Sequence, residues 1–371
     1  MTAKHILIGN GINIQYGGAQ YLNSNIINRT MANAKNGHYE FGMQKTIAPN
    51  ELHKFFALLR NVVIKEVLEG KYDQYVLSGE EKRALCDFHE RYPCSNTDIC
   101  QIGFEDYFLV FRLLHNKFNE DDIIRNGSKT ALKRLFLDAI YNNGHLSAIH
   151  EDFPEGLISF LNEYDTLFTV NYDANIERAT GRDAVHLHGQ FDVLEDVYDP
   201  NSFRNQLPDR PSDNFDIPDE WRHTYCNAIM DFSKDFQVAM NSHANAGLQK
   251  LVAAATNNAD LLGEIENWKD DSNTHVRNLY YAYKAKQENA NLELREYPLS
   301  KIDGIFGHMH ILGLSPNNDT HILEHIRANN GIDMIRYYYH SKEEGQRTKE
   351  YFGNKKVECL DVRDLWDSFE E

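Results

Sequence analysis

Short runs of β-branched and aromatic residues alternate with helical stretches along this chain, and this alternation restricts its fold more than any other feature. The runs lie near the start, the middle and the end of the chain, at residues 5–8, 166–170, 184–188, 305–314, 334–339 and 357–360. Strands that alternate with helices indicate an α/β fold with a mostly parallel sheet. We therefore expect a single sheet that is assembled from three distant stretches of sequence.

Two long, mainly helical regions separate these stretches, so we expect one core with insertions and not two domains in series. The clearest helix, at 51–69, carries apolar residues at three-to-four spacing inside a helical insertion of residues 31–159. A second insertion, residues 196–299, starts with a loop at 200–218 that holds four of the nine prolines and continues as helix. The expected sheet core comprises residues 1–30, 160–195 and 300–371.

Composition excludes several classes of protein. The chain has 38 basic and 56 acidic residues, and a net charge of −18 disfavours direct binding of nucleic acid. No apolar run approaches the ~18–20 residues that cross a bilayer, and the N-terminus lacks the pattern of a signal peptide. The five cysteines form no CxxC pair, which argues against a disulfide framework and a structural zinc site. We expect a cytoplasmic protein that binds no membrane.

The first segment that could carry chemistry is HILIGNG, which places Gly9, Asn10 and Gly11 directly after an expected strand. A glycine turn at this point lets backbone N–H groups approach a pyrophosphate, because a side chain would block the approach. The full GxGxxG pattern is absent, since position 14 is Ile14, and no acidic residue follows about 20 positions later. A tight turn without a ligand is the alternative.

The second segment brings polar side chains to the ends of two strands. Asn171 and Asp173 follow one strand, and His188 ends the next. Because ligands bind at the carboxyl ends of strands in open α/β sheets, we expect these side chains to converge on one rim. His186 shares the face of His188 if the strand continues that far. The alternative is that Asn171 and Asp173 cap a helix and His188 is a buried core histidine.

The third segment is the strand-to-helix turn in ILGLSPNND. Gly313 and Ser315 lie at the end of the expected strand, where they could contact a ribose or a phosphate. Asp319 is placed to cap a helix that runs to about residue 328. An ordinary turn is the alternative.

TVNYDANIERATG followed by VHLHGQ resembles the sirtuin pattern, in which Asn-x-Asp after a strand precedes Ala-x-Gly and then His-Gly. The resemblance covers about a third of the chain and implies a Rossmann-like sheet of the sirtuin type that binds NAD+. It places Asn171 and Asp173 around the nicotinamide ribose and makes His188 the catalytic base. It further assigns the phosphates of NAD+ to Gly9, Asn10 and Gly11 and the adenosine half to Gly313 and Ser315.

The zinc module of sirtuin deacylases, with its two CxxC pairs, is missing, which disfavours a deacylase. The chain is instead similar to the sirtuin-like NAD+ hydrolases of bacterial anti-phage defence, most of all to the stand-alone subunit that partners a HerA-type ATPase. The Ile-Gly-Asn-Gly opening also resembles the abortive-infection AbiH proteins. These resemblances imply that NAD+ is the substrate, that nicotinamide and ADP-ribose are the products, that the chain forms a homo-oligomer and that no metal is needed.

Two other functions stay open. GHMH at 307–310 and the pair His186 and His188 match parts of the calcineurin-like, metal-dependent phosphoesterase pattern, because imidazoles two residues apart on a strand can share a metal. The Asp-x-His and Gly-Asn-His steps of that family are absent. The second alternative is a catalytically silent subunit that uses a nucleotide fold for assembly.

Overall fold

The computed structural model describes most of the chain. The expected proline-containing loop at 200–218 lies outside the described residues. The described residues are 2–36, 49–93, 99–120, 122–193, 219–232, 234–235, 238, 243–271, 274–292, 297–316 and 319–369.

Six parallel strands form one sheet in the order β3-β2-β1-β4-β5-β6. All six expected strands are confirmed, but β3 ends at His186, two residues earlier than expected. The strand order reverses between β1 and β4, as it does in dinucleotide-binding Rossmann folds. The chain therefore has a Rossmann-like α/β fold. The strands are β1 Lys4–Ile8, β2 Thr166–Thr169, β3 Ala184–His186, β4 Gly307–Leu312, β5 Ile332–Tyr339 and β6 Lys356–Asp361.

Helices cover both faces of the sheet. Alternate residues of a strand point to opposite faces, so one strand contributes apolar side chains to the packing on both sides. Ile6 and Ile8 of β1 belong to one apolar cluster, whereas Leu7 between them belongs to another. The first cluster includes residues of α1 Gly11–Gly17, α8 Glu155–Asn162, α9 Asn175–Thr180 and α17 Val362–Asp367. The second includes residues of α14 Ser300–Asp303 and α15 Thr320–Ala328, and α16 Lys342–Tyr351 packs against it.

The helices between β1 and β2 share the first apolar cluster with the sheet. The helix expected at 51–69 is present as α3 Pro49–Leu58, a π-helical segment η2 Leu59–Val63 and α4 Ile64–Leu68. The other helices here are α2 Asn23–Lys35, α5 Gly79–Arg91, α6 Asp106–Phe118 and α7 Asp122–Tyr141. Short 3₁₀ turns connect them: η1 Ala19–Tyr21, η3 Asp73–Tyr75, η4 Ile99–Gln101 and η5 Asn142–Asp152.

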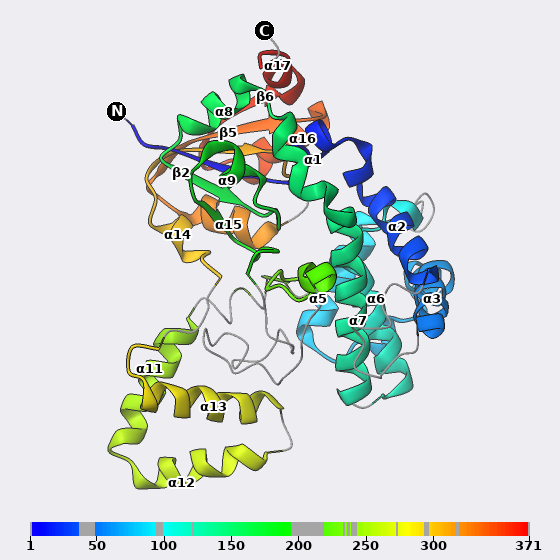
Figure 1. Ribbon diagram of the computed structural model, residues 1–371, viewed down its shortest axis with the longest axis vertical. Coiled ribbons are helices and arrows are strands. Elements are labelled where there is room, and N and C mark those ends of the chain that lie inside the picture. The colour runs from blue at the N-terminus through cyan, green and yellow to red at the C-terminus, as the bar shows by residue number, and fades with distance from the viewer. Residues whose placement is uncertain are drawn as a thin grey trace.

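The region between β3 and β4 contains a separate group of helices that stands apart from the sheet (Figure 1). Leu248, Ile265 and Tyr283 belong to an apolar cluster of its own, distinct from the two clusters of the sheet. The elements of this group are α11 Ala244–Thr256, α12 Ala259–Asn267, η8 Trp268–Asp270 and α13 Thr274–Glu288, whereas η7 Asp219–Thr224 packs against α7. The helical character expected for this region is confirmed from residue 244 onward, as several helices and not one.

Two further findings concern the described residues. None of their helices is both long enough and apolar enough to cross a membrane. Cys86, Cys226 and Cys359 are free thiols.

Candidate functional site

A cavity of about 430 Å³ lies at the carboxyl edge of the sheet. Residues that follow four strands line it: Asn10 after β1, Asn171 after β2, His188 after β3 and Gly313 after β4. The cavity therefore includes the point between β1 and β4 where the strand order reverses, which is where Rossmann folds bind nucleotides. Its volume is typical of a small-molecule site.

The glycines of the first turn, Gly9 and Gly11, do not line the cavity themselves. They lie against Gly313, which does. Their backbone N–H groups donate hydrogen bonds to the carbonyls of Leu312 and Gly313, both at 2.9 Å. A Cβ on Gly9 would lie 2.5 Å from the carbonyl oxygen of Gly313, and a Cβ on Gly11 would overlap the Gly313 Cα. These glycines are needed because the turns after β1 and β4 touch backbone to backbone.

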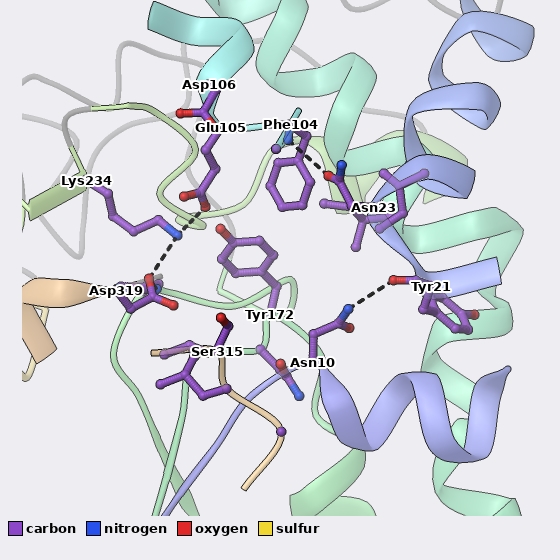
Figure 2. Close-up of a pocket in the computed structure, with 18 of the residues that line it drawn as sticks. Asn10, Tyr21, Asn23, Phe104, Glu105, Asp106, Tyr172, Lys234, Ser315 and Asp319 are labelled. Carbon is purple, nitrogen blue, oxygen red and sulfur yellow. Dashed lines mark hydrogen bonds and ion pairs between the residues drawn. The ribbon is translucent and has the colours of Figure 1, made fainter. Parts of the chain in front are cut away.

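The other expected site residues meet in the cavity, and Ser315 from the turn after β4 is among them (Figure 2). The Asn10 side chain donates a hydrogen bond of 3.0 Å to the Tyr21 carbonyl. The lining residues that the sequence analysis names are Asn10, Asn171, Asp173, His188, Gly313, Ser315 and Asp319.

Asn171 and Asp173 are held by hydrogen bonds, and neither is the N-cap of α9, which is Ala174. The Asn171 amide donates to the Gly9 carbonyl at 3.3 Å, which joins the turns after β2 and β1. Asp173 is buried and accepts hydrogen bonds from the Asn13 amide at 2.7 Å and from the Asn175 backbone at 3.1 Å. Burial raises the pKa of Asp173, and these hydrogen bonds oppose that rise.

Asn13 is a lining residue that the sequence analysis missed. It lies in α1, directly after the glycine turn, and Asp173 fixes its amide group. Its Oδ1 is buried and has no hydrogen-bond partner among the described residues. A buried acceptor without a partner costs free energy, so a donor on a ligand would fit here. Its position in the GNGIN segment, two residues after Gly11, is the sequence feature from which it could have been predicted.

His186 does not share the cavity with His188. Its Nδ1 lies 2.9 Å from the Asn171 carbonyl oxygen and its Nε2 lies 2.6 Å from Glu177 Oε1. Burial disfavours the charged ring, but the Glu177 carboxylate outweighs it and raises the pKa of His186. Burial would raise the pKa of Glu177, yet His186 lowers it. The charged pair of His186 and Glu177 therefore stabilises the turn that contains Asn171, from outside the cavity.

This pair makes stability depend on pH. Because the folded-state pKa of His186 is raised, its contribution is complete below the unfolded value of about 6.5 and disappears as the pH rises through the folded value. We expect Glu177→Gln to lower the free energy of unfolding by about 1–3 kcal/mol near pH 6, and by progressively less above neutrality. Urea unfolding of both proteins over this range checks it. A difference that grows with pH would contradict the assignment.

His188 is completely buried and lies just beyond β3. Its carbonyl accepts a hydrogen bond of 2.9 Å from the Ile229 backbone, and Gly189 follows with a φ of 81°. A Cβ on Gly189 would overlap the carbonyl of Asn227, so the His-Gly step requires glycine. Burial lowers the pKa of His188 well below its ordinary value, and Lys234 and His321 lower it further. The ring is therefore neutral at neutral pH.

The partners of the His188 ring come from α15 and the turn before it. Its Nε2 lies 2.9 Å from His321 Nε2, and its Nδ1 lies 3.7 Å from Asp319 Oδ1. Asp235 Oδ1 lies 2.5 Å from the other ring nitrogen of His321, Nδ1. Asp319 was expected only as a cap, and His321, which follows it by two positions on the first turn of α15, was not expected at the site.

Asp319 stands at the N-cap position of α15, as expected, but its side chain makes no capping hydrogen bond. Its φ is 55°, in the left-handed region that residues other than glycine rarely adopt. The carboxylate instead lies beside His188 and 3.8 Å from the Lys234 ammonium. Backbone strain of this kind is common where a side chain is held for function.

Both insertions reach the cavity through charged side chains. Figure 2 shows Lys234 between Glu105 and Asp319, and Lys234 forms an ion pair with each. Burial disfavours the Lys234 ammonium, but these two carboxylates and Tyr172 raise its pKa above the ordinary value. Glu105 precedes α6 in the first insertion and Lys234 belongs to the second, so no local pattern predicts that they meet.

His188, Asp319 and His321 are also the described residues that could share a metal ion, since their ligand atoms lie within 4.8 Å of one another. Two imidazoles and a carboxylate suit a divalent transition metal. In this geometry, however, the two rings contact each other directly and the Lys234 ammonium opposes a second cation beside Asp319. His188 Nδ1 and His321 Nδ1 are buried and have no hydrogen-bond partner among the described residues.

The other histidines of the phosphoesterase pattern do not join this cluster. His308 and His310 lie on β4, and neither lines the cavity. The His310 ring is buried, and its Nδ1 lies 2.6 Å from the Tyr164 hydroxyl.

Comparison with known proteins gives no family for this chain: no family model, no curated protein and no solved structure matches it.

Proposed function

We propose that this protein is an NAD+ hydrolase that cleaves the bond between nicotinamide and ribose and releases nicotinamide and ADP-ribose. The observation that carries the proposal is the cavity at the strand-order reversal of a Rossmann-like sheet, lined by Asn171, Asp173 and a neutral, buried His188. Dinucleotides bind at this place in such folds. The resemblance of the Asn-x-Asp and His-Gly segments to sirtuins supports NAD+ over other dinucleotides.

Cleavage of the bond between nicotinamide and ribose does not need a strong general acid. Nicotinamide is cationic in NAD+ and leaves as a neutral molecule, while positive charge develops on the ribose as in glycoside hydrolysis. A neutral imidazole can accept the proton of the attacking water, and a side-chain amide can both donate and accept hydrogen bonds. We assign these roles to His188 and Asn171. Asp173 holds the Asn13 amide and acts as an orienting group.

The glycine turn contributes in another way than the sequence suggests. The N–H groups of Gly9 and Gly11 are bonded to the turn after β4, so they are not available to the phosphates of NAD+. We propose that the polar side chains beside them, Asn10, Asn13 and Ser315, contact the dinucleotide instead.

The biological setting follows from the resemblance alone. We propose that the chain depletes NAD+ in anti-phage defence, as a homo-oligomer and with a HerA-type ATPase as a partner. A hydrolase of this kind must be restrained in healthy cells, which such a partner could do.

A metal-dependent phosphoesterase is the second candidate, because His188, Asp319 and His321 are close enough to share an ion. It would use a cation in place of a neutral base to activate water. The hydrolase and the phosphoesterase therefore differ in whether chelation removes activity.

The experiment is NAD+ consumption by the purified protein, with chromatography of the products. We expect nicotinamide and ADP-ribose in equal amounts, unchanged by EDTA and without stoichiometric metal in the protein. A nitrophenyl phosphodiester is the control substrate for the alternative. Cleavage of that ester, lost in EDTA, together with intact NAD+, would replace the hydrolase by the phosphoesterase.

A further inference from the structure

The fully buried His188 needs a defined tautomer if it is to act as a base. A neutral imidazole has one nitrogen that carries a proton and one that accepts, and the accepting nitrogen must face the substrate. His188 Nδ1 is buried and has no hydrogen-bond partner among the described residues, whereas its Nε2 faces His321. The tautomer therefore depends on what His321 offers to Nε2.

The contact between Asp235 and His321 Nδ1 determines which ring nitrogen of His321 carries a proton. Asp235 Oδ1 lies 2.5 Å from His321 Nδ1. The contact does not have hydrogen-bond geometry, because His321 Nδ1 has no hydrogen-bond partner among the described residues. A bare ring nitrogen so close to a carboxylate would still oppose lone pair to lone pair, so His321 Nδ1 carries a proton. Asp235 is the charged partner in this contact, because His321 lowers the pKa of the carboxyl against the effect of burial.

The remaining protons follow from this one. In a neutral His321 ring a proton on Nδ1 leaves Nε2 as an acceptor, and the 2.9 Å contact then requires His188 to donate from Nε2. His188 Nδ1 is left bare. The opposite arrangement would point a proton of His188 at Asp319, 3.7 Å away and too far for a hydrogen bond.

We propose that Asp235 and His321 are positioning residues, which set the tautomer of His188 and leave its Nδ1 as the proton-accepting atom of the site. Its role in turnover rests on the proposed hydrolase; the tautomer itself does not. Asp235 lines the cavity and His321 does not, and the positioning role of both is exerted through His188. The arrangement follows the same logic as a catalytic triad, in which a carboxylate orients a histidine for its task.

The proton balance is simple. As the bond from the ribose carbon to nicotinamide breaks, its electron pair leaves with neutral nicotinamide, and the water oxygen bonds to that carbon. The water gives one proton to His188 Nδ1. The resulting imidazolium donates from Nε2 to His321, with the Asp319 carboxylate beside it, and the proton returns to solvent when the products leave. No oxidant, reductant or metal takes part.

The first test reads the tautomer without any substrate. Proton–nitrogen correlation NMR of protein labelled with ¹⁵N-histidine separates protonated from bare ring nitrogens, and the His188 signals are identified by their loss in His188→Gln. We expect a protonated Nε2 and a bare Nδ1 in His188. We expect Asp235→Asn to mix the two tautomers. A proton on His188 Nδ1 in the wild type would overturn the proposal.

The second test reads turnover, with a matched control on the same helix. His325 and Asp303 form a second His–Asp contact, at 2.7 Å, that lies outside the cavity. We expect His321→Phe and Asp235→Asn to lower kcat by about 10- to 100-fold, the range found for partners that orient metal-bound histidines. His325→Phe and Asp303→Asn should leave kcat unchanged.

The pH profile separates positioning from general damage. The charged and titratable groups that face His188 are Lys234, His321 and Asp319, with Asp235 behind His321. Removing the Asp235 charge should move the acid limb of kcat/KM to lower pH, because one carboxylate fewer stabilises the imidazolium. An unmoved limb with unchanged kcat would overturn the proposal. If the wild type consumes no NAD+, the proposed function fails and the NMR result alone decides the tautomer.

Discussion

We expect His188→Ala and Asn171→Ala to abolish NAD+ consumption while the protein stays folded. Loss of a general base costs on the order of 10²–10⁴-fold in rate, which would bring turnover to background. Asn171 contributes the polar contact to the ribose or the water, and its amide also ties the turn after β2 to Gly9. Product chromatography gives the rate, and circular dichroism reports the fold.

The control must also remove a buried polar side chain. His310 is a buried histidine with a hydrogen-bond partner, but it lies outside the cavity, so His310→Ala should lower stability and leave turnover intact. Asn175→Ala is the matched control for Asn171, since Asn175 is buried and bonded to the Leu146 carbonyl. Retained turnover in His188→Ala, at wild-type level, would remove His188 from the mechanism.

The second large effect concerns stability. We expect Gly11→Ala to destabilise the protein by about 3 kcal/mol or more, because overpacking costs about 1–3 kcal/mol even where side chains can yield. Here the new Cβ would overlap the backbone of Gly313, and the backbone cannot retreat without breaking the hydrogen bond from Gly11 to Gly313. Urea unfolding followed by fluorescence measures the loss.

Gly247→Ala is the matched control. Gly247 lies inside α11, and nothing lies within 4 Å of the place that a Cβ would take. Alanine stabilises a helix interior relative to glycine by about 0.5–1 kcal/mol, so this variant should unfold at the same or a higher urea concentration. Equal unfolding midpoints for Gly11→Ala and the wild type would mean that the two turns do not touch as described.

The strands could be predicted from the sequence because they are short runs of β-branched and aromatic residues, and this signal also found β3 and β6, which contain no buried residue. Register and neighbour order could not, since they depend on contacts between stretches more than 100 residues apart, such as β1 with β2. The end of β3 was placed two residues too late. Apolar Leu187 continues the pattern and its N–H still donates to the Thr169 carbonyl, but β2 ends at Thr169 and no residue pairs with Leu187.

Some residues of the candidate site could be predicted from the sequence and others could not. Asn171, Asp173 and His188 follow strands directly, so the rule that ligands bind at carboxyl ends of strands finds them. Lys234 and Glu105 come from the two helical insertions, and their place over the sheet is a matter of tertiary packing that carries no local signal. His321 could have been found, because it lies within one helical turn of Asp319 on the helix that the sequence analysis expects.

The backbone conformation of Asp319 lowers the stability of the folded protein. A left-handed backbone costs a residue with a side chain roughly 1–2 kcal/mol, and α15 also forgoes a capping bond of about 1 kcal/mol. Glycine at this position would relieve the backbone, and serine could restore the cap, but either would take the carboxylate away from His188. Stability and activity therefore make opposite demands on this single residue, so a variant of position 319 that unfolds at higher temperature is expected to lose activity.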